Sequence, residues 1–155
     1  MNLLDKVAVC SRSFSKNTFL REELLARYKN VTFNENGSSM NGDMLIKFLT
    51  GHDKAIVAME EIDAHVISSL PQLKVIAKYG VGIDKIDLKA MKKFKKRLGW
   101  VKGINKRSVS ELVISLAINL LRHVSYADKE VSNGNWQQFI GSQLTGKVFG
   151  VIGCG

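Results

Sequence analysis

Short apolar segments alternate with amphipathic helical segments along the first two thirds of the chain, and this alternation is the strongest constraint on its fold. Strands are expected at 7–10, 31–33, 55–59, 73–79 and around residues 100–101. Helices are expected between them, and a Ser/Asn-rich loop should follow the first strand. Such alternation is typical of a parallel sheet covered on both faces. It predicts an α/β fold, a flavodoxin-like doubly wound parallel sheet of five strands in the order 2-1-3-4-5.

A long helix is expected after this sheet. Ser108 and Glu111 have the S-x-x-E spacing of a capping box, in which each side chain bonds a backbone N–H of the first turn. A broad apolar face follows, so the helix is expected to run to about His123, with a second helical stretch to Val131. Residues 132–135 (SNGN) should end that stretch.

The last nine residues, 147–155 (KVFGVIGCG), have the pattern of a buried strand that enters a tight glycine turn. This is how the first strand of a dinucleotide-binding βαβ unit opens, G-x-G-x-x-G, and Gly153 and Gly155 are its first two glycines. The third glycine, the helix and the ribose-binding acid are not in this sequence. We therefore expect two domains, 1–104 and 105–155, the second being the truncated start of a Rossmann domain.

Composition and charge exclude several classes of protein. An apolar fraction of 45% and a single proline indicate a globular chain, and no window reaches the ~20 apolar residues of a membrane span. Two cysteines without a framework or metal spacing favour a reducing cytoplasm. Much of the net charge of +9 lies in 89–97, where apolar residues at helical spacing indicate an amphipathic helix with a solvated basic face. No nucleic-acid or membrane partner is expected.

The segment 78–87 (KYGVGIDKID) carries the sharpest local signal for a binding site. Two glycines around Val81, at the carboxyl end of the fourth strand, let the backbone turn and expose N–H groups that can hold a carboxylate. On spacing alone, an ordinary tight turn is the better explanation. Asp84 and Asp87 are expected to serve as turn and cap residues of the following helix.

Three segments together resemble the D-isomer-specific 2-hydroxyacid dehydrogenases, the family of phosphoglycerate, glycerate and formate dehydrogenases. They are 73–87 (LKVIAKYGVGIDKID), 105–111 (NKRSVSE) and 144–155 (LTGKVFGVIGCG). Their order and separation are similar to those of the family across nearly the whole chain. The resemblance implies a flavodoxin-like substrate domain, a Rossmann domain that binds NAD, and hydride transfer between a 2-hydroxy acid and a 2-oxo acid.

The same resemblance implies roles for individual residues. The backbone N–H groups of Val81 and Gly82 would bind the substrate carboxylate, and Asn105 would lie near the floor of the cleft between the domains. Val109 would approach the nicotinamide, while Gly153 and Gly155 would begin the turn around the pyrophosphate. The partner is then a small 2-hydroxy or 2-oxo acid, and a homodimer is implied for the full-length protein.

The family's mechanism requires a histidine, an acid partner and an arginine that would all lie beyond this sequence. His52, His65 and His123 are expected to be ordinary surface or boundary residues, and Cys10 a small core residue. We therefore expect no catalytic residue here, no activity of this chain alone and no measurable affinity for NAD. The acidic residues Glu60 and Glu61 after the third strand disfavour a phosphate-bearing substrate unless Arg12 or Lys78 offsets them.

Other classes share the expected strand order. A response-regulator receiver needs an aspartate at the end of its third strand, where Met59 and Glu60 stand instead. A flavodoxin needs a Ser/Thr-rich phosphate loop after its first strand, which 11–18 (SRSFSKNT) matches only loosely. A flavodoxin-like binding or interaction module without catalysis, including a naturally short one, stays open as the alternative.

Overall fold

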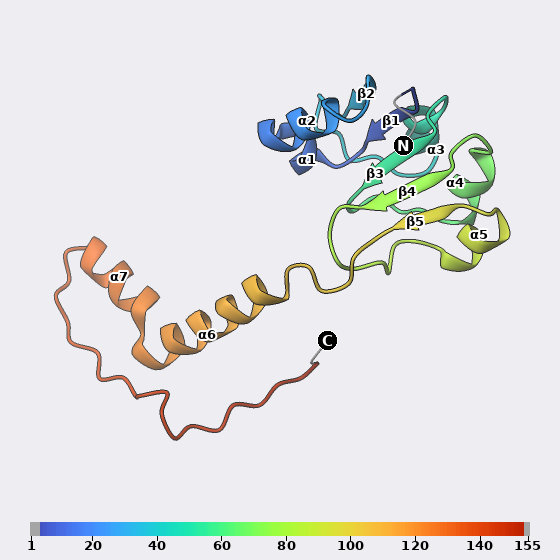
Figure 1. Ribbon diagram of the computed structural model, residues 1–155. Helices are drawn as coiled ribbons and strands as arrows, with labels where there is room; N and C mark the ends of the chain where they lie inside the picture. The colour runs from blue at the N-terminus through green and yellow to red at the C-terminus, as the bar shows by residue number, and fades with distance from the viewer. Residues whose placement is uncertain (1–3, 154–155) are drawn as a thin grey trace. The chain divides into compact units, whose positions relative to one another are not determined.

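A computed structural model describes residues 4–153 of the chain. It divides into two compact units, Met1–Lys102 and Gly103–Gly155, which meet two residues before the predicted domain boundary. The first unit holds a parallel sheet of five strands in the order β2-β1-β3-β4-β5 (Figure 1). The predicted flavodoxin-like α/β class and strand order are confirmed. The strands are β1 (Lys6–Val9), β2 (Asn30–Phe33), β3 (Lys54–Val57), β4 (Val75–Lys78) and β5 (Arg97–Gly99).

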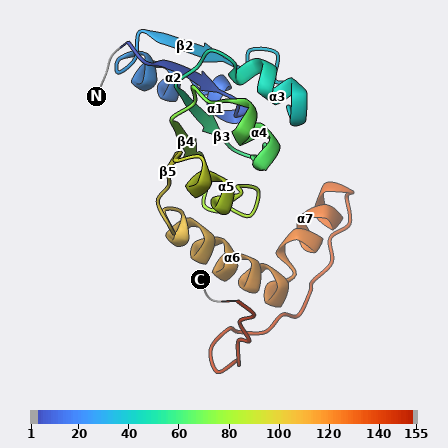
Figure 2. The ribbon, with the colours of Figure 1, turned by 90° about the vertical axis from the view of Figure 1, so that its right-hand side faces the viewer.

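Helices cover the sheet on both sides, as the ribbon shows in two orthogonal views (Figures 1 and 2). On one side lie α1 (Arg12–Lys16) and α2 (Thr18–Leu25), and on the other α3 (Gly42–Leu49), α4 (Ala64–Ser69) and α5 (Leu88–Lys93). Asp63 caps α4 and Asp87 caps α5, because each carboxylate accepts an N–H of the first turn at 2.8 and 2.9 Å. The cap predicted at Asp87 is confirmed.

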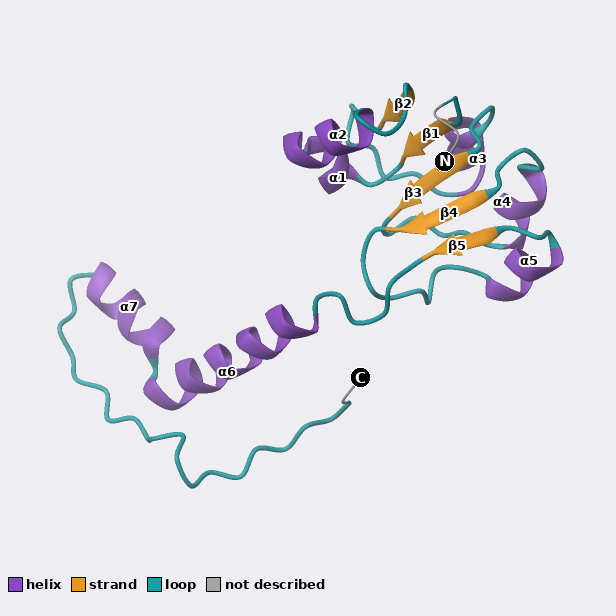
Figure 3. Cartoon of the chain, in the orientation of Figure 1, coloured by secondary structure: helices purple, strands orange, loops and turns teal. Residues whose placement is uncertain are grey.

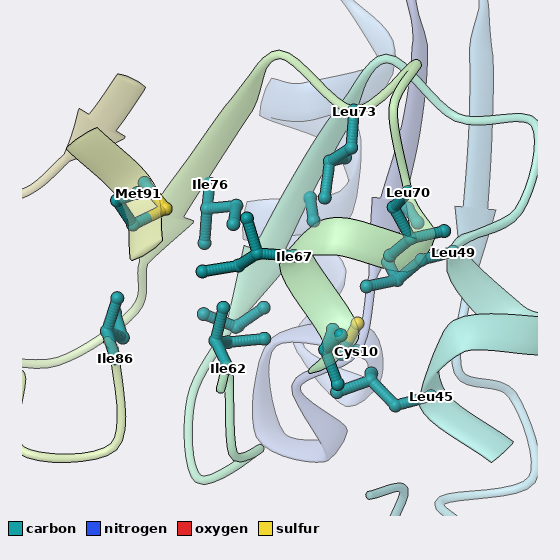
Figure 4. Close-up of a cluster of buried hydrophobic side chains, with 14 of the residues drawn as sticks. Cys10, Leu45, Leu49, Ile62, Ile67, Leu70, Leu73, Ile76, Ile86 and Met91 are labelled. Atoms are coloured by element: carbon teal, nitrogen blue, oxygen red, sulfur yellow. The ribbon is translucent and has the colours of Figure 1, made fainter. Parts of the chain in front are cut away.

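The side chains of the central strands alternate between two cores. In β1, Val7 and Val9 pack with Phe14 and Leu24 beneath α1 and α2, since successive strand residues point to opposite faces. The intervening residues belong to the larger core beneath α3, α4 and α5 (Figure 4). This larger core contains Ala8, Cys10, Leu45, Leu49, Val57, Ile62, Ile67, Leu70, Leu73 and Ile76, all at most 1% exposed. The core role predicted for Cys10 is confirmed.

Three local predictions are wrong in the first unit. The Ser/Asn-rich loop after β1 contains the short helix α1, because Ser11 accepts the N–H of Phe14 at 3.3 Å and so caps it. The basic helix α5 ends at Lys93, since Lys95 adopts a left-handed φ of 55°. Strand β5 therefore begins at Arg97, earlier than predicted, and Trp100 lies just beyond its end.

The second unit contains α6 (Lys106–Arg122) and α7 (Val124–Ser132), separated by His123 in a left-handed conformation. Helix α6 begins before Ser108 and has Asn105 at its N-cap, so the predicted capping box is wrong. The strand predicted at the chain's end is also wrong for the described residues. Residues 133–153 carry no strand (Figure 3), because none of them pairs with another strand and a strand needs a neighbour for its backbone groups.

Candidate functional site

The loop after β4 is held at both ends. At its start, the N–H of Tyr79 donates to the carbonyl of Val57 at 2.8 Å, and the Tyr79 ring meets Phe14 edge to face at 5.4 Å. At its end, the N–H of Ile86 donates to Ile83 at 3.0 Å, and Ile86 forms a parallel bridge with Ile62. Both anchors come from buried or paired residues, so the loop's ends are fixed by the sheet and its flanking segments.

Between these anchors, the backbone presents unused hydrogen-bond donors. Among the described residues, the N–H groups of Gly80, Val81 and Gly82 have no acceptor. Gly80 has a φ of 129°, which side chains rarely adopt, so this position rather than Gly82 requires glycine conformationally. Consecutive free N–H groups at the end of a strand form a concave donor site suited to a carboxylate.

Two side chains border this loop: Asp84, which belongs to the segment 78–87 singled out by sequence, and Trp100, which the sequence did not single out. Trp100 donates its indole N–H to the carbonyl oxygen of Val81 at 3.0 Å. The carboxylate of Asp84 lies beside Gly82, since a Cβ added to Gly82 would stand 2.9 Å from its Oδ1. Asp84 has no hydrogen-bond or ion-pair partner within residues 4–153, so its charge is not offset there.

A pocket of about 390 Å³ opens at the carboxyl ends of β1 and β3. Its lining is rich in hydroxyl and charged groups, contributed by Ser11, Arg12, Ser13, Lys16, Gly37, Ser39, Ala58, Met59 and Glu60. Carboxyl ends of neighbouring parallel strands lie at one edge of a sheet, so this pocket and the loop after β4 occupy the same edge. Lys78 links them, because its Nζ donates to the carbonyl of Ala58.

Glu60 is 7% exposed, and its Oε2 accepts the N–H of Ala58 at 2.6 Å. The carboxylate is therefore turned back onto its own strand end. Arg12 and Lys16 at the same pocket have no acceptor or ion pair among the described residues.

Burial raises the pKa of the Cys10 thiol far above its usual range, and the charge of Glu60 adds to the rise. Cys10 is consequently no nucleophile.

The histidines are engaged elsewhere. His52 contacts Thr32 through Nε2 at 2.9 Å and stacks on Phe48, while His65 pairs with the exposed Asp43. His123 ends α6. Within the described residues, no cluster of His, Cys, Asp and Glu is suited to a metal ion. No helix described between residues 4 and 153 combines the length and apolarity needed to cross a membrane.

The second unit carries the remaining residues singled out by sequence. Asn105 precedes α6, and its side chain makes no cap bond. Val109 lies in the first turns of that helix and is 49% exposed. Gly153 has a φ of 84° with open space where a Cβ would stand, whereas Gly155 lies outside the described residues. Their predicted roles toward substrate and NAD remain predictions.

Comparison with known proteins gives these features a family. Residues 7–147 match the sequence profile of the D-isomer specific 2-hydroxyacid dehydrogenase catalytic domain. The chain is 33% identical over 121 residues to D-3-phosphoglycerate dehydrogenase of Archaeoglobus fulgidus, covering 76% of this chain and 23% of that protein. It is 31% identical over 144 residues to glyoxylate/hydroxypyruvate reductase A of Arabidopsis thaliana, covering 90% and 45%.

Solved structures agree with the sequence relatives. A D-isomer specific 2-hydroxyacid dehydrogenase from Polaromonas superposes with a TM-score of 0.82 and 26% identity, over 92% of this chain and 46% of that one. The pyruvate reductase of Chlamydomonas reinhardtii shares the fold, with a TM-score of 0.74 and 23% identity over 91% of this chain and 43% of that one. The chain thus spans less than half the length of these relatives. It belongs to the D-isomer-specific 2-hydroxyacid dehydrogenase family, whose catalytic domain it matches.

Proposed function

We propose that this chain supplies the substrate-binding part of an NAD-dependent enzyme that interconverts a 2-hydroxy acid and a 2-oxo acid. The observation that carries the proposal is the row of unused N–H donors at Gly80, Val81 and Gly82. All substrates of this class share a carboxylate next to the reacting carbon. A donor site on fixed backbone would hold that group in one orientation, whatever the rest of the substrate is.

The pocket beside the loop would receive the substituent of the acid. Arg12 and Lys16 have no ion pair there, and Glu60 is turned onto the N–H of Ala58. The acidic sequence after β3 is therefore a weaker objection to an anionic substituent, because Arg12 and Lys16 are two unpaired cations at the pocket and Glu60 is a single carboxylate there. A polar or anionic substituent of a few atoms suits this lining better than an apolar one.

NAD binding is proposed for the whole enzyme rather than for residues 4–153 alone. Gly153 adopts a left-handed φ, as the first glycine of a pyrophosphate turn can, but residues 147–153 are not a strand. A helix N-terminus supplies much of the binding energy for a pyrophosphate. We expect calorimetry to detect no NAD binding to this chain alone, and the hydride step is assigned to no residue of it.

A titration of the isotope-labelled chain with glyoxylate, the smallest 2-oxo acid, tests the carboxylate site. The backbone N–H resonances of Val81 and Gly82 should shift saturably. Gly82→Val should weaken binding at least about tenfold, since its side chain would displace the Asp84 carboxylate and crowd the donors. Val81→Ile, the matched control, contributes the same N–H and should bind within about twofold of wild type.

The same pair of substitutions can be read in turnover. In a full-length enzyme carrying this segment, Gly82→Val should raise KM for every 2-oxo acid tested with NADH, because the shared carboxylate is the group affected. Equal and mild effects of the two substitutions, or glyoxylate shifts outside the 79–83 loop, would show that this loop is only a turn. The chain would then be better described as a binding or interaction module.

A further inference from the structure

We propose that Trp100 is a positioning residue that sets the direction of the Gly82 N–H. The starting point is the hydrogen bond from the indole N–H of Trp100 to the carbonyl oxygen of Val81, at 3.0 Å. That carbonyl belongs to the same peptide unit as the Gly82 N–H. The described chain has no cis peptide bond, and in a planar trans peptide the C=O and N–H point in opposite directions. Holding the Val81 carbonyl toward Trp100 therefore turns the Gly82 N–H away from Trp100.

This peptide unit needs an external partner to choose its direction. Type I and type II turns differ in the direction of their central peptide unit. The type II direction needs a positive φ at the residue after that peptide, which glycine readily adopts. Gly82 is that residue, and its lack of a Cβ makes both orientations accessible. No other described contact engages either polar group of the Val81–Gly82 peptide. The Trp100 bond therefore favours the observed one of these two orientations.

Trp100 is well placed to act as a fixed reference. It follows β5 directly, and β5 is paired with β4 through Ala77 and Gly99. The two strands approach so closely that a Cβ on Gly99 would stand 3.4 Å from the Ala77 Cβ. The Trp100 side chain is half-buried, and a half-buried indole N–H normally finds a hydrogen-bond partner. The direction of the Val81–Gly82 peptide is thereby fixed relative to the sheet.

That Gly82 then serves a substrate carboxylate rests on the proposed function, whereas the direction of its N–H does not. The experiment separates the two. Residual dipolar couplings report the direction of each N–H bond in the ligand-free chain. Trp100→Phe keeps an aromatic ring but removes the donor. Trp136→Phe is the matched control, because Trp136 is 93% exposed and has no partner among the described residues.

In wild type and Trp136→Phe, the Gly82 coupling should fit the structure of residues 4–102. In Trp100→Phe, the Gly82 coupling should depart from that value, because the N–H then samples both orientations. Couplings in the strands should stay unchanged, which distinguishes this effect from general destabilisation. One hydrogen bond of typical net strength shifts the ratio of the two orientations about fivefold. The apparent dissociation constant for glyoxylate should rise by no more than that factor.

An unchanged Gly82 coupling in Trp100→Phe would overturn the inference. If that variant fails to fold, hydrogen exchange of the wild-type indoles decides instead: the Trp100 N–H should exchange at least about tenfold more slowly than that of Trp136. Equal exchange rates would also overturn it. The Gly82 N–H could be oriented in wild type and lose that orientation in Trp100→Phe while glyoxylate does not bind. That result would support the inference and refute the proposed function.

Discussion

The two units of this chain contain similar apolar helices but differ in what covers them. In the first unit, Leu45 and Leu49 of α3 are fully buried against the sheet. In the second, Leu112, Leu116 and Leu120 of α6 are between 49% and 77% exposed, and neither α6 nor α7 has a buried residue among those described. An apolar helix face stabilises a fold only when other residues remove it from water. Burial against a sheet, and not helix pattern, distinguishes the two units.

The largest expected effect sets one leucine of each unit against the other. Leu49→Ala should lower the free energy of unfolding by about 2–5 kcal/mol, because it leaves a cavity in a fully buried core. Leu120→Ala, on the exposed face of α6, should change it by no more than about 0.5 kcal/mol. Urea unfolding of both variants measures the difference. Similar losses would mean that α6 is covered in solution.

Removing the second unit should alter association more than stability. A chain ending at residue 104 keeps every strand of the sheet and both cores. It should melt near the temperature of the first unit in the intact chain. It should also self-associate less, since the large exposed apolar surface of α6 is gone. Sedimentation velocity and thermal melts test this. A monomeric intact chain, or an unfolded truncated one, would contradict it.

A smaller effect concerns binding in the first unit. Asp84→Asn should strengthen glyoxylate binding about two- to fivefold, because it removes a negative charge beside the Gly82 donors. Two charges a few ångströms apart in water interact by roughly 1 kcal/mol. Asp128→Asn removes an equally unpaired carboxylate from α7 and should leave the affinity unchanged. Equal gains from the two substitutions would indicate a general effect of net charge. The glyoxylate affinities of the two variants should become similar as salt is added.

The smallest effect is a pH dependence carried by the first unit. Asp53 accepts the backbone N–H of Lys6 and the Lys74 ammonium, both at 3.0 Å, and the pKa of its carboxyl is lowered chiefly by the first. A lowered folded-state pKa stabilises the fold above the unfolded value near 4 and loses that contribution as the pH falls below it. Asp53→Asn should flatten this acid limb in pH-dependent unfolding.

The class of fold and the order of its strands follow from the amino-acid pattern alone. Apolar alternation requires a sheet with two covered faces, and aspartates such as Asp63 and Asp87 mark helix starts through local bonds that any chain with that spacing can make. The glycine pair around Val81 likewise marked the position of the proposed carboxylate site, because the turn at this strand end needs a residue that tolerates the φ of Gly80.

Features that depend on partners distant in sequence follow only from the folded chain. Three features bring together segments that no local pattern relates. They are the contact between Trp100 and Val81, the pocket at the ends of β1 and β3, and the buried position of Glu60. The same dependence explains the wrong strand prediction at the chain's end. Residues 148–152 are apolar enough for a strand, but a strand exists only where a second one accepts its hydrogen bonds, and the described chain offers them none.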